Sequence, residues 1–271
     1  MVLSLRYKAT TSIPVEVEGI TPNAVRNLSI SEIEHLEAFQ GNQKTSLAEF
    51  FDVSGDPTDG EMIWEGDLHG VHWIGAKMTD GKIVVEGNAG RHIGSEMTGG
   101  EIIVNGDAGD WVGGEMHGGF IHVHGRAGHL IGAAYRGSAR GMTGGTILID
   151  GAVGNEIGHT MRRGLLAVGG DAGDLAGFNM LAGSILVFGS AGIRHGAGMK
   201  RGTIGFFGEE APPLLPTFRH ACRYCPDVLS LIFGKLRSRG FPLPAAVDTM
   251  IDLYNGDLIE GGRGEIFMRV L

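Results

Sequence analysis

Short runs of alternating apolar residues return at a nearly constant spacing through the middle of the chain. They read EMIWE, KIVVE, EIIVN, FIHVH, TILID, LLAVG, SILVF and TIGFF. Period-two alternation and β-branched side chains predict β-strands. The segments between the runs follow the form G-x-A-G-x-x-I-G-x-x-M-x-x-G, and none is long enough for a crossover helix.

The glycine-rich segments define an internal repeat. The units begin at Gly66, Gly87, Gly106, Gly125, Gly151, Gly170, Gly189 and Gly208. The steps between them are 21, 19, 19, 26, 19, 19 and 19 residues. A fixed period near 20 residues is typical of a solenoid, in which each turn of chain stacks one strand in parallel on the last.

Equivalent positions of successive coils carry the same residue types, as a stacked fold requires. One column is Ile83, Ile102, Ile121, Ile147, Leu166, Ile185 and Ile204. Two residues further on stand Val85, Val104, Val123, Ile149, Val168, Val187 and Phe206. Seven of the eleven methionines form another column: Met78, Met97, Met116, Met142, Met161, Met180 and Met199. An alanine column, Ala89, Ala108, Ala127, Ala172 and Ala191, lies beside the predicted turns.

The sequence therefore predicts an all-β protein whose central part, residues 60–208, is a right-handed parallel β-helix with glycine-rich coils of about 19 residues. Residues 1–59 predict a small α+β segment with strands in LSLRYK and IPVEVEGI, and with a helix in SISEIEHLEAF capped by Ser29 or Ser31. Residues 209–271 predict a helical segment, with helices over PDVLSLIFGKLRSRG and AAVDTMIDLYNG. Both ends are expected to cap open strands.

Composition narrows the function classes. Glycine accounts for 48 of 271 residues. Because a glycine-rich loop such as GNAGRHIGSEMTGG recurs in every coil, we interpret it as part of the architecture and not as a nucleotide site. The net charge of −9 argues against nucleic-acid binding. We expect no signal peptide and no membrane span. Two cysteines form no disulfide framework, which favours the cytoplasm.

The sequence contains no catalytic constellation that we can assign. His122 and His124 share one strand face at a spacing that metal sites use, but with no third or fourth ligand evident an outward polar pair is favoured and no metal is expected. Cys222 and Cys225 form a C-x-x-C pair without a second pair, which favours two reduced thiols at the start of a helix. His195 is interpreted as marking the end of the core, and the insertion between Gly132 and Gly141 as a candidate functional loop.

Two surface features suggest partners. The first is the middle column of the strands, which is apolar although it faces away from the core, so terminal segments or another subunit should cover it: Ile63, Val84, Ile103, His122, Leu148, Ala167, Leu186 and Gly205.

The second feature is an uneven distribution of charge. Residues 60–125 contain ten acidic and three basic residues, whereas residues 126–208 contain four acidic and eight basic residues. Four of the basic residues follow two methionines: Arg162, Arg163, Lys200 and Arg201. They are either solvated surface or an electropositive edge that binds an acidic partner or a polycarboxylate.

The repeat, with GNQKTSLAEFFDVSG before it and YNGDLIEGGRGEIF after it, resembles the C subunit of formylmethanofuran dehydrogenase over nearly the full length. The form most similar is that of the bacterial formyltransferase/hydrolase complex, and the excess of Arg (16) over Lys (6) also favours a bacterial source. The glycine-rich coils alone are similar to a domain of glutamate synthase.

The resemblance implies a non-catalytic β-helix subunit of a multi-subunit C1 enzyme. In the bacterial complex the formyl group of formyl-tetrahydromethanopterin passes to a furan carrier and leaves as formate. The resemblance implies no cofactor in this chain; metal ions, tetrahydromethanopterin and the furan carrier are expected on partners, namely an amidohydrolase-like hydrolase, a formyltransferase and a further subunit. Arg162, Arg163, Lys200 and Arg201 are candidates to contact the carrier's glutamate-rich tail.

Two alternatives to this interpretation stay open. One is the C subunit of a methanogen-type molybdenum or tungsten formylmethanofuran dehydrogenase. The other is a stand-alone β-helix enzyme, which should have turnover of its own and a cleft of paired acids, or a glutamate-synthase-like β-helix domain.

Overall fold

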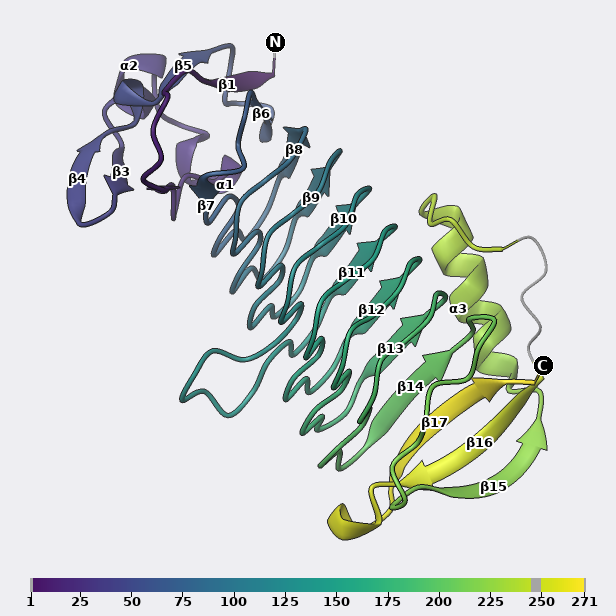
Figure 1. The fold of residues 1–271 in the computed structure, drawn as a ribbon. Coiled ribbons are helices and arrows are strands. Elements are labelled where there is room, and N and C mark those ends of the chain that lie inside the picture. Colours follow the sequence, from purple (N-terminus) through teal and green to yellow (C-terminus); the bar gives the residue numbers. More distant parts are fainter. Residues whose placement is uncertain (1, 245–249, 271) are drawn as a thin grey trace.

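The computed structural model describes residues 2–244 and 250–270. All eight runs of alternating apolar residues form strands: β6 (Glu61–Glu65), β8 (Lys82–Glu86), β9 (Glu101–Val104), β10 (Phe120–Val123), β11 (Thr146–Ile149), β12 (Leu165–Val168), β13 (Ser184–Val187) and β14 (Gly202–Phe206). Each pairs in parallel with the next along the chain, so the strands stack like rungs (Figure 1). The predicted strands and the all-β class are confirmed.

Neighbouring coils stay in register even across the insertion. Ile121 lies opposite Ile102 on one side and opposite Ile147 on the other, although the second step is longer. The extra residues loop out of the stack after β10 (Figure 1). Hydrogen bonds between coils also continue outside the strands, where the Gly113 N–H donates to the Ile93 carbonyl at 2.8 Å. Backbone groups are therefore satisfied coil by coil.

The predicted columns fill the interior of the stack. All residues of the isoleucine-rich column and all seven column methionines are fully buried, at 0% exposure. The unbranched methionine side chain fills irregular gaps between coils, which suits a position shared by every turn. The period of 19 therefore arises because each coil must present the same side chains to its neighbours.

Gly113 illustrates why glycine is needed at the corners of the coils. Its φ of +63° lies in the left-handed region, and a Cβ there would lie 2.4 Å from Cδ1 of Ile147. An alanine would be strained by both the backbone and the clash. The glycine thus lets the isoleucine of another coil enter the interior.

The N-terminal segment closes one end of the stack. Strand β1 (Leu3–Tyr7) pairs in parallel with β6, and β5 (Phe51–Ser54) pairs antiparallel with β1. A separate four-stranded sheet contains β2 (Val15–Glu16), β3 (Glu37–Gln40), β4 (Gln43–Ser46) and β7 (Val71–His72). Helices α1 (Pro22–Val25) and α2 (Ile30–Glu34) and the 3₁₀ turn η1 (Leu47–Glu49) complete the segment. Ser29 caps α2 in a capping box with Glu32, so the cap predicted at Ser29 or Ser31 is Ser29. The helix predicted over SISEIEHLEAF is wrong for its second half, because residues 37–39 pair with β4 as part of β3.

The C-terminal segment differs from the predicted helical segment. Its described residues form one helix, α3 (Asp227–Ser238), the 3₁₀ turn η2 (Leu258–Glu260) and three strands, β15 (Arg219–Tyr224), β16 (Ile251–Gly256) and β17 (Gly264–Arg269). Strand β17 pairs in parallel with β14, and β16 and β15 follow antiparallel. Thirteen described strands thus form one sheet.

The predicted helix over residues 245–256 is wrong for its second half. Residues 245–249 lie outside the described residues, but residues 251–256 form β16. Strand β17 offers a free edge along this stretch, and pairing with it satisfies six residues of backbone. Tertiary pairing overrides the local pattern.

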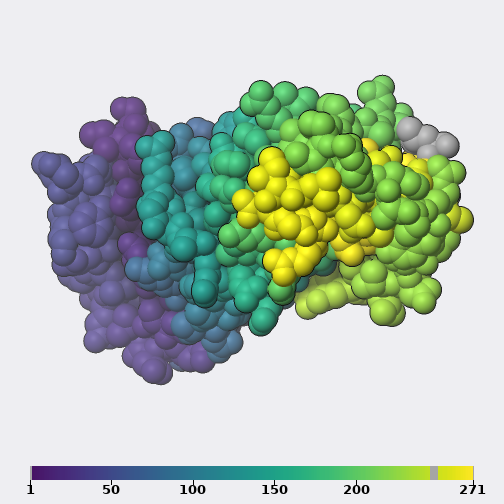
Figure 2. Space-filling view, turned by 90° about the horizontal axis from the view of Figure 1, so that it is seen from below, coloured from purple at the N-terminus to yellow at the C-terminus, as the bar shows by residue number. Residues whose placement is uncertain are grey.

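Helix α3 covers part of the outward apolar column. Leu148, Ala167 and Leu186 are buried in one cluster with Leu229 and Phe233 of α3. The prediction that a terminal segment covers this face is confirmed for these coils by that cluster. Seen from below, the yellow C-terminal residues lie next to the later coils (Figure 2). Ile63, Val84 and Ile103, in the earlier coils, stay half-buried. Among the described residues, no helix combines the length and the apolar character that crossing a bilayer requires.

Met116→Ala should lower the free energy of unfolding by about 2–5 kcal/mol, because it removes a fully buried side chain between two packed coils. Met116→Leu, which keeps the volume, should lower it by less than about 1.5 kcal/mol. Urea unfolding followed by circular dichroism measures both; equal losses would mean that the column tolerates cavities.

Candidate functional site

Carboxylates at the coil corners bond the stack together. Asp107 Oδ1 accepts a hydrogen bond from the Arg126 N–H of the next coil at 2.7 Å. Asp174 Oδ1 accepts one from the Ile193 N–H at 2.9 Å, again one coil further on. Charge-assisted bonds of this kind support the turns, so these acids serve the architecture.

The predicted basic residues gather around a surface hollow of about 300 Å³. Arg162 and Lys200 each follow a buried column methionine, and they stand two coils apart on the same edge. Arg201 lies beside Lys200 and also lines the hollow. All three side chains are exposed. The repeat thus brings them together, whereas Arg163, the fourth predicted residue, is not among the residues that line the hollow.

Two further arginines line this hollow and were not among the four candidate residues. Arg140 comes from the insertion, and Arg263 comes from the loop before β17. Neither residue belongs to the repeat, so the 19-residue spacing could not indicate that they lie at the hollow. The Nζ of Lys200 lies 3.9 Å from Oε2 of Glu260, and this carboxylate offsets part of the positive charge of the hollow. Four arginines and one lysine can bind a polycarboxylate or another acidic chain.

An aromatic stack occupies one corner of the early coils. The ring of His92 lies parallel to Trp73, with centroids 4.0 Å apart, and stacks on Trp111 at 5.5 Å. The three residues are spaced by 19, so the repeat places them in one column. They were not predicted as a cluster, although their spacing equals the period of the repeat and indicates that the three rings lie in one column.

The insertion contributes Tyr135 to this stack. Its hydroxyl donates to Ser95 Oγ at 2.7 Å and lies 3.0 Å from Nδ1 of His92. Burial, aided by His72 and Arg91, lowers the pKa of His92 to about 4. Burial also raises the pKa of Tyr135 to about 12. The insertion therefore has a packing role here, with a neutral imidazole at its centre.

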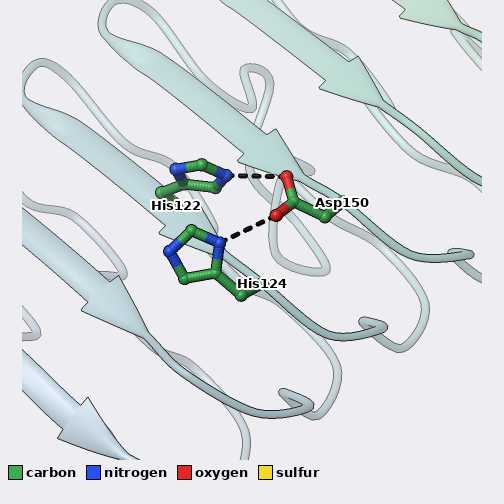
Figure 3. Close-up of side chains that lie close together, drawn as sticks. All are labelled: His122, His124 and Asp150. Atoms are coloured by element: carbon green, nitrogen blue, oxygen red, sulfur yellow. Dashed lines mark hydrogen bonds and ion pairs between the residues drawn. The ribbon is translucent and has the colours of Figure 1, made fainter. Parts of the chain in front are cut away.

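A second histidine cluster lies on β10 and β11 (Figure 3). His122 Nε2 is 2.7 Å from Asp150 Oδ1, and His124 Nδ1 is 2.8 Å from Asp150 Oδ2. His122 is buried, at 2% exposure. His124 lies just past the strand end and is exposed. The expected outward polar pair is thus a buried and an exposed imidazole held by one carboxylate.

The third member of this cluster is Asp150, which was not identified from the sequence. His122 pairs with Leu148, so Asp150, two residues on, stands on the same face beside His124. The register between coils was the signal that could have found it. Burial tends to raise the pKa of Asp150, but hydrogen bonds from His122 and His124 outweigh burial, so the pKa is lowered.

The other candidate residues lie apart from these clusters. Cys222 is in β15 and Cys225 precedes α3, and both thiols are free and exposed. The predicted place at the start of a helix is wrong for Cys222, because its segment pairs with β16 as a strand. His195 is 1% exposed and packs its ring against Phe206 at 4.8 Å. Its Nδ1 accepts a hydrogen bond from the Ala176 N–H at 3.3 Å, and burial lowers its pKa. It is a neutral core residue at the end of the stack.

The pKa of His92 predicts how stability depends on pH. An unfolded histidine has a pKa near 6.5, so between about 6.5 and about 4 the unfolded state binds a proton that the folded state does not. Stability should therefore fall as pH drops through this window. In His92→Phe, which keeps a stacked ring, Tm should depend less on pH there. The exposed His69→Phe controls for loss of a histidine; an unchanged slope in His92→Phe would contradict the assignment.

The comparisons with known proteins agree with the sequence resemblance. No protein-family model matches the chain. The C subunit of the tungsten-containing formylmethanofuran dehydrogenase 2 of Methanothermobacter wolfeii is 39% identical over 93 residues, which is 33% of this chain and 34% of the relative. The C subunit of the molybdenum-containing formylmethanofuran dehydrogenase 1 of Methanothermobacter thermautotrophicus is 42% identical over 84 residues, 31% of this chain and 21% of the relative. These matches span at most about a third of the curated relatives.

A solved structure matches the whole chain. It is a chain of the formyltransferase/hydrolase complex (FhcABCD) from Methylorubrum extorquens in complex with methylofuran. The identity is 31%, the TM-score is 0.90, and the match covers 99% of this chain and 100% of the other. At this identity and coverage the likeness includes both flanks as well as the repeat. The chain therefore belongs to the family of formylmethanofuran dehydrogenase C subunits, in the form found in the bacterial formyltransferase/hydrolase complex.

Proposed function

We propose that this chain is the non-catalytic scaffold subunit of a bacterial formyltransferase/hydrolase complex. That complex passes the formyl group of formyl-tetrahydromethanopterin to a furan carrier and hydrolyses it to formate. The observation that carries the proposal is the match to a chain of the FhcABCD complex over 99% of this chain and 100% of the other. Coils, insertion and both terminal segments are shared, as expected of one subunit in one assembly.

The architecture that suits this role is a right-handed parallel β-helix over residues 60–208, with residues 1–59 and 209–271 as its two ends. Strands paired in parallel and in register, joined by coils of 19 residues, support this assignment. Terminal strands at both ends keep the stack from adding further coils. A rod of this kind offers long, rigid surfaces on which other subunits can dock.

The chemistry of the complex belongs, in this proposal, to the other subunits. These are an amidohydrolase-like hydrolase with its metal ions, a formyltransferase that binds tetrahydromethanopterin, and a further subunit, all in the cytoplasm. The use of Asp107 and Asp174 in coil-to-coil bonds supports a structural role for the acids of this chain. The half-buried residues Ile63, Val84 and Ile103 offer one apolar strip for contact with a partner.

The basic hollow at Arg162, Lys200 and Arg201 is the surface that we assign to the acidic tail of the furan carrier. The related complex was solved with methylofuran, so a furan carrier is a ligand of that assembly. Guanidinium groups of Arg140 and Arg263 extend the hollow and can bind successive carboxylates.

Reversing the three charges in Arg162→Glu/Lys200→Glu/Arg201→Glu should weaken binding of an oligoglutamate peptide to the purified complex by about tenfold or more at low salt. Fluorescence anisotropy with a labelled peptide measures the affinity. Arg163→Glu, one residue from Arg162 but outside the hollow, is the matched control and should bind nearly as the wild type does. Equal affinity in the triple variant would remove the carrier assignment.

The assembly itself is tested by purifying the tagged chain from its native host and identifying the proteins that accompany it. We expect stoichiometric hydrolase and formyltransferase subunits and release of formate from formyl-tetrahydromethanopterin. Pterin-containing molybdenum or tungsten subunits with iron–sulfur clusters would instead identify the dehydrogenase form. A chain that is isolated alone and turns over a substrate would overturn the scaffold role.

A further inference from the structure

The cluster of His122, His124 and Asp150 can do more than hydrogen-bond to itself. Its three ligand atoms lie within 4.8 Å of one another, and within the described ranges it is the one group of three or more such residues that meets this distance. We propose that these three side chains bind one divalent first-row transition-metal ion, for which Zn²⁺ is the probe. This site is separate from the basic hollow and does not depend on the proposed function.

The ligand set has the chemistry for such an ion. Two imidazole nitrogens and one carboxylate oxygen suit Zn²⁺, Co²⁺ and Fe²⁺, whereas Mg²⁺ and Ca²⁺ prefer oxygen alone. Ligand atoms around a tetrahedral zinc with bonds near 2.0–2.1 Å stand about 3.3 Å apart. At present His122 Nε2 lies 2.7 Å from Asp150 Oδ1, and His124 Nδ1 lies 2.8 Å from Asp150 Oδ2. These two contacts have hydrogen-bond length, so the side chains must move apart to admit the ion.

The protons of the cluster balance on binding. In the hydrogen-bonded state His122 donates from Nε2 and His124 donates from Nδ1, since Asp150 is ionised. On binding the metal, each neutral ring moves its proton, by exchange with water, from the nitrogen that faces Asp150 to its other nitrogen, and offers the freed lone pair to the ion. No oxidant or reductant is needed, and the carboxylate already carries its charge.

The architecture of the stack does not require a histidine at this position. The register neighbours of His122 are Ile103 and Leu148, which satisfy the same column with apolar side chains. Burying an imidazole costs free energy that burying the neighbouring apolar side chains does not, so His122 needs a polar partner or a ligand to offset that cost. His124 and Asp150 meet it at this one pair of coils, and they do so across the step that contains the insertion.

The site is closed on one side and open on the other. His122 is 3% exposed in its side chain and Asp150 18%, whereas His124 is 42% exposed. The ion would thus be anchored at His122, and water would fill the remaining coordination positions on the side of His124. Three protein ligands with open positions are the arrangement of a metal site that retains solvent.

The test is zinc binding to the full chain after removal of metals with a chelator. It is made in a Cys222→Ser/Cys225→Ser background, because the two exposed thiols are themselves zinc ligands. Calorimetry should give one zinc ion per chain, and Co²⁺ should show a visible absorption band that zinc displaces. Asp150→Asn and His124→Gln, which keep the shape of the side chains, should each weaken binding by about tenfold or more.

His220→Gln is the matched control, because His220 also pairs with an aspartate, Asp252, at 3.1 Å but belongs to no such triad. It should bind zinc as the parent does. Circular dichroism shows whether each variant is folded, and His124, being exposed, tolerates replacement. Absence of binding in the folded parent, or affinity unchanged in both Asp150→Asn and His124→Gln, would overturn the proposal.

Discussion

The backbone hydrogen bonds between successive coils are the constraint on which the rest of the structure depends. Because strands such as β9 and β10 pair in parallel and in register, every side chain lies over its equivalent in the neighbouring coil. A coil can then differ from its neighbours only where the column tolerates it. The insertion obeys the same rule, since it leaves Ile121 opposite Ile147 and places its extra residues outside the stack.

The candidate sites are completed where this regularity is interrupted. The insertion places Tyr135 in the aromatic stack and Arg140 at the basic hollow. His122 replaces an apolar column residue and meets Asp150 of the next coil. The C-terminal segment adds Arg263 to the hollow and covers the outward face of the later coils with α3. The repeat thus supplies part of each candidate site, and residues that do not repeat complete it.

The sequence predicts the repetitive part of this fold well. Columns of isoleucine and methionine at intervals of 19 residues can be read directly, because the same packing environment selects the same residue in each coil. The edge made by Arg162, Lys200 and Arg201 follows from the same periodicity. Ser29 could also be foreseen as a helix cap, since a capping box is local in sequence.

The parts that could not be predicted depend on contacts between segments. Residues 251–256 form a strand because β17 offers an edge, which no local pattern reveals. Asp150 occupies the position of the next coil that is equivalent to His124, and equivalent positions in a stack are spatial neighbours. Arg263 reaches the hollow only because the chain returns after α3 to pair with β14.

The central claim is that this chain holds a multi-subunit enzyme together without performing its chemistry. Native mass spectrometry of the complex, prepared with this chain and from a strain lacking it, tests that claim most directly. We expect one assembly containing hydrolase and formyltransferase when the chain is present, and separate subunits when it is deleted. An intact assembly of hydrolase and formyltransferase in the deletion strain would contradict the scaffold role.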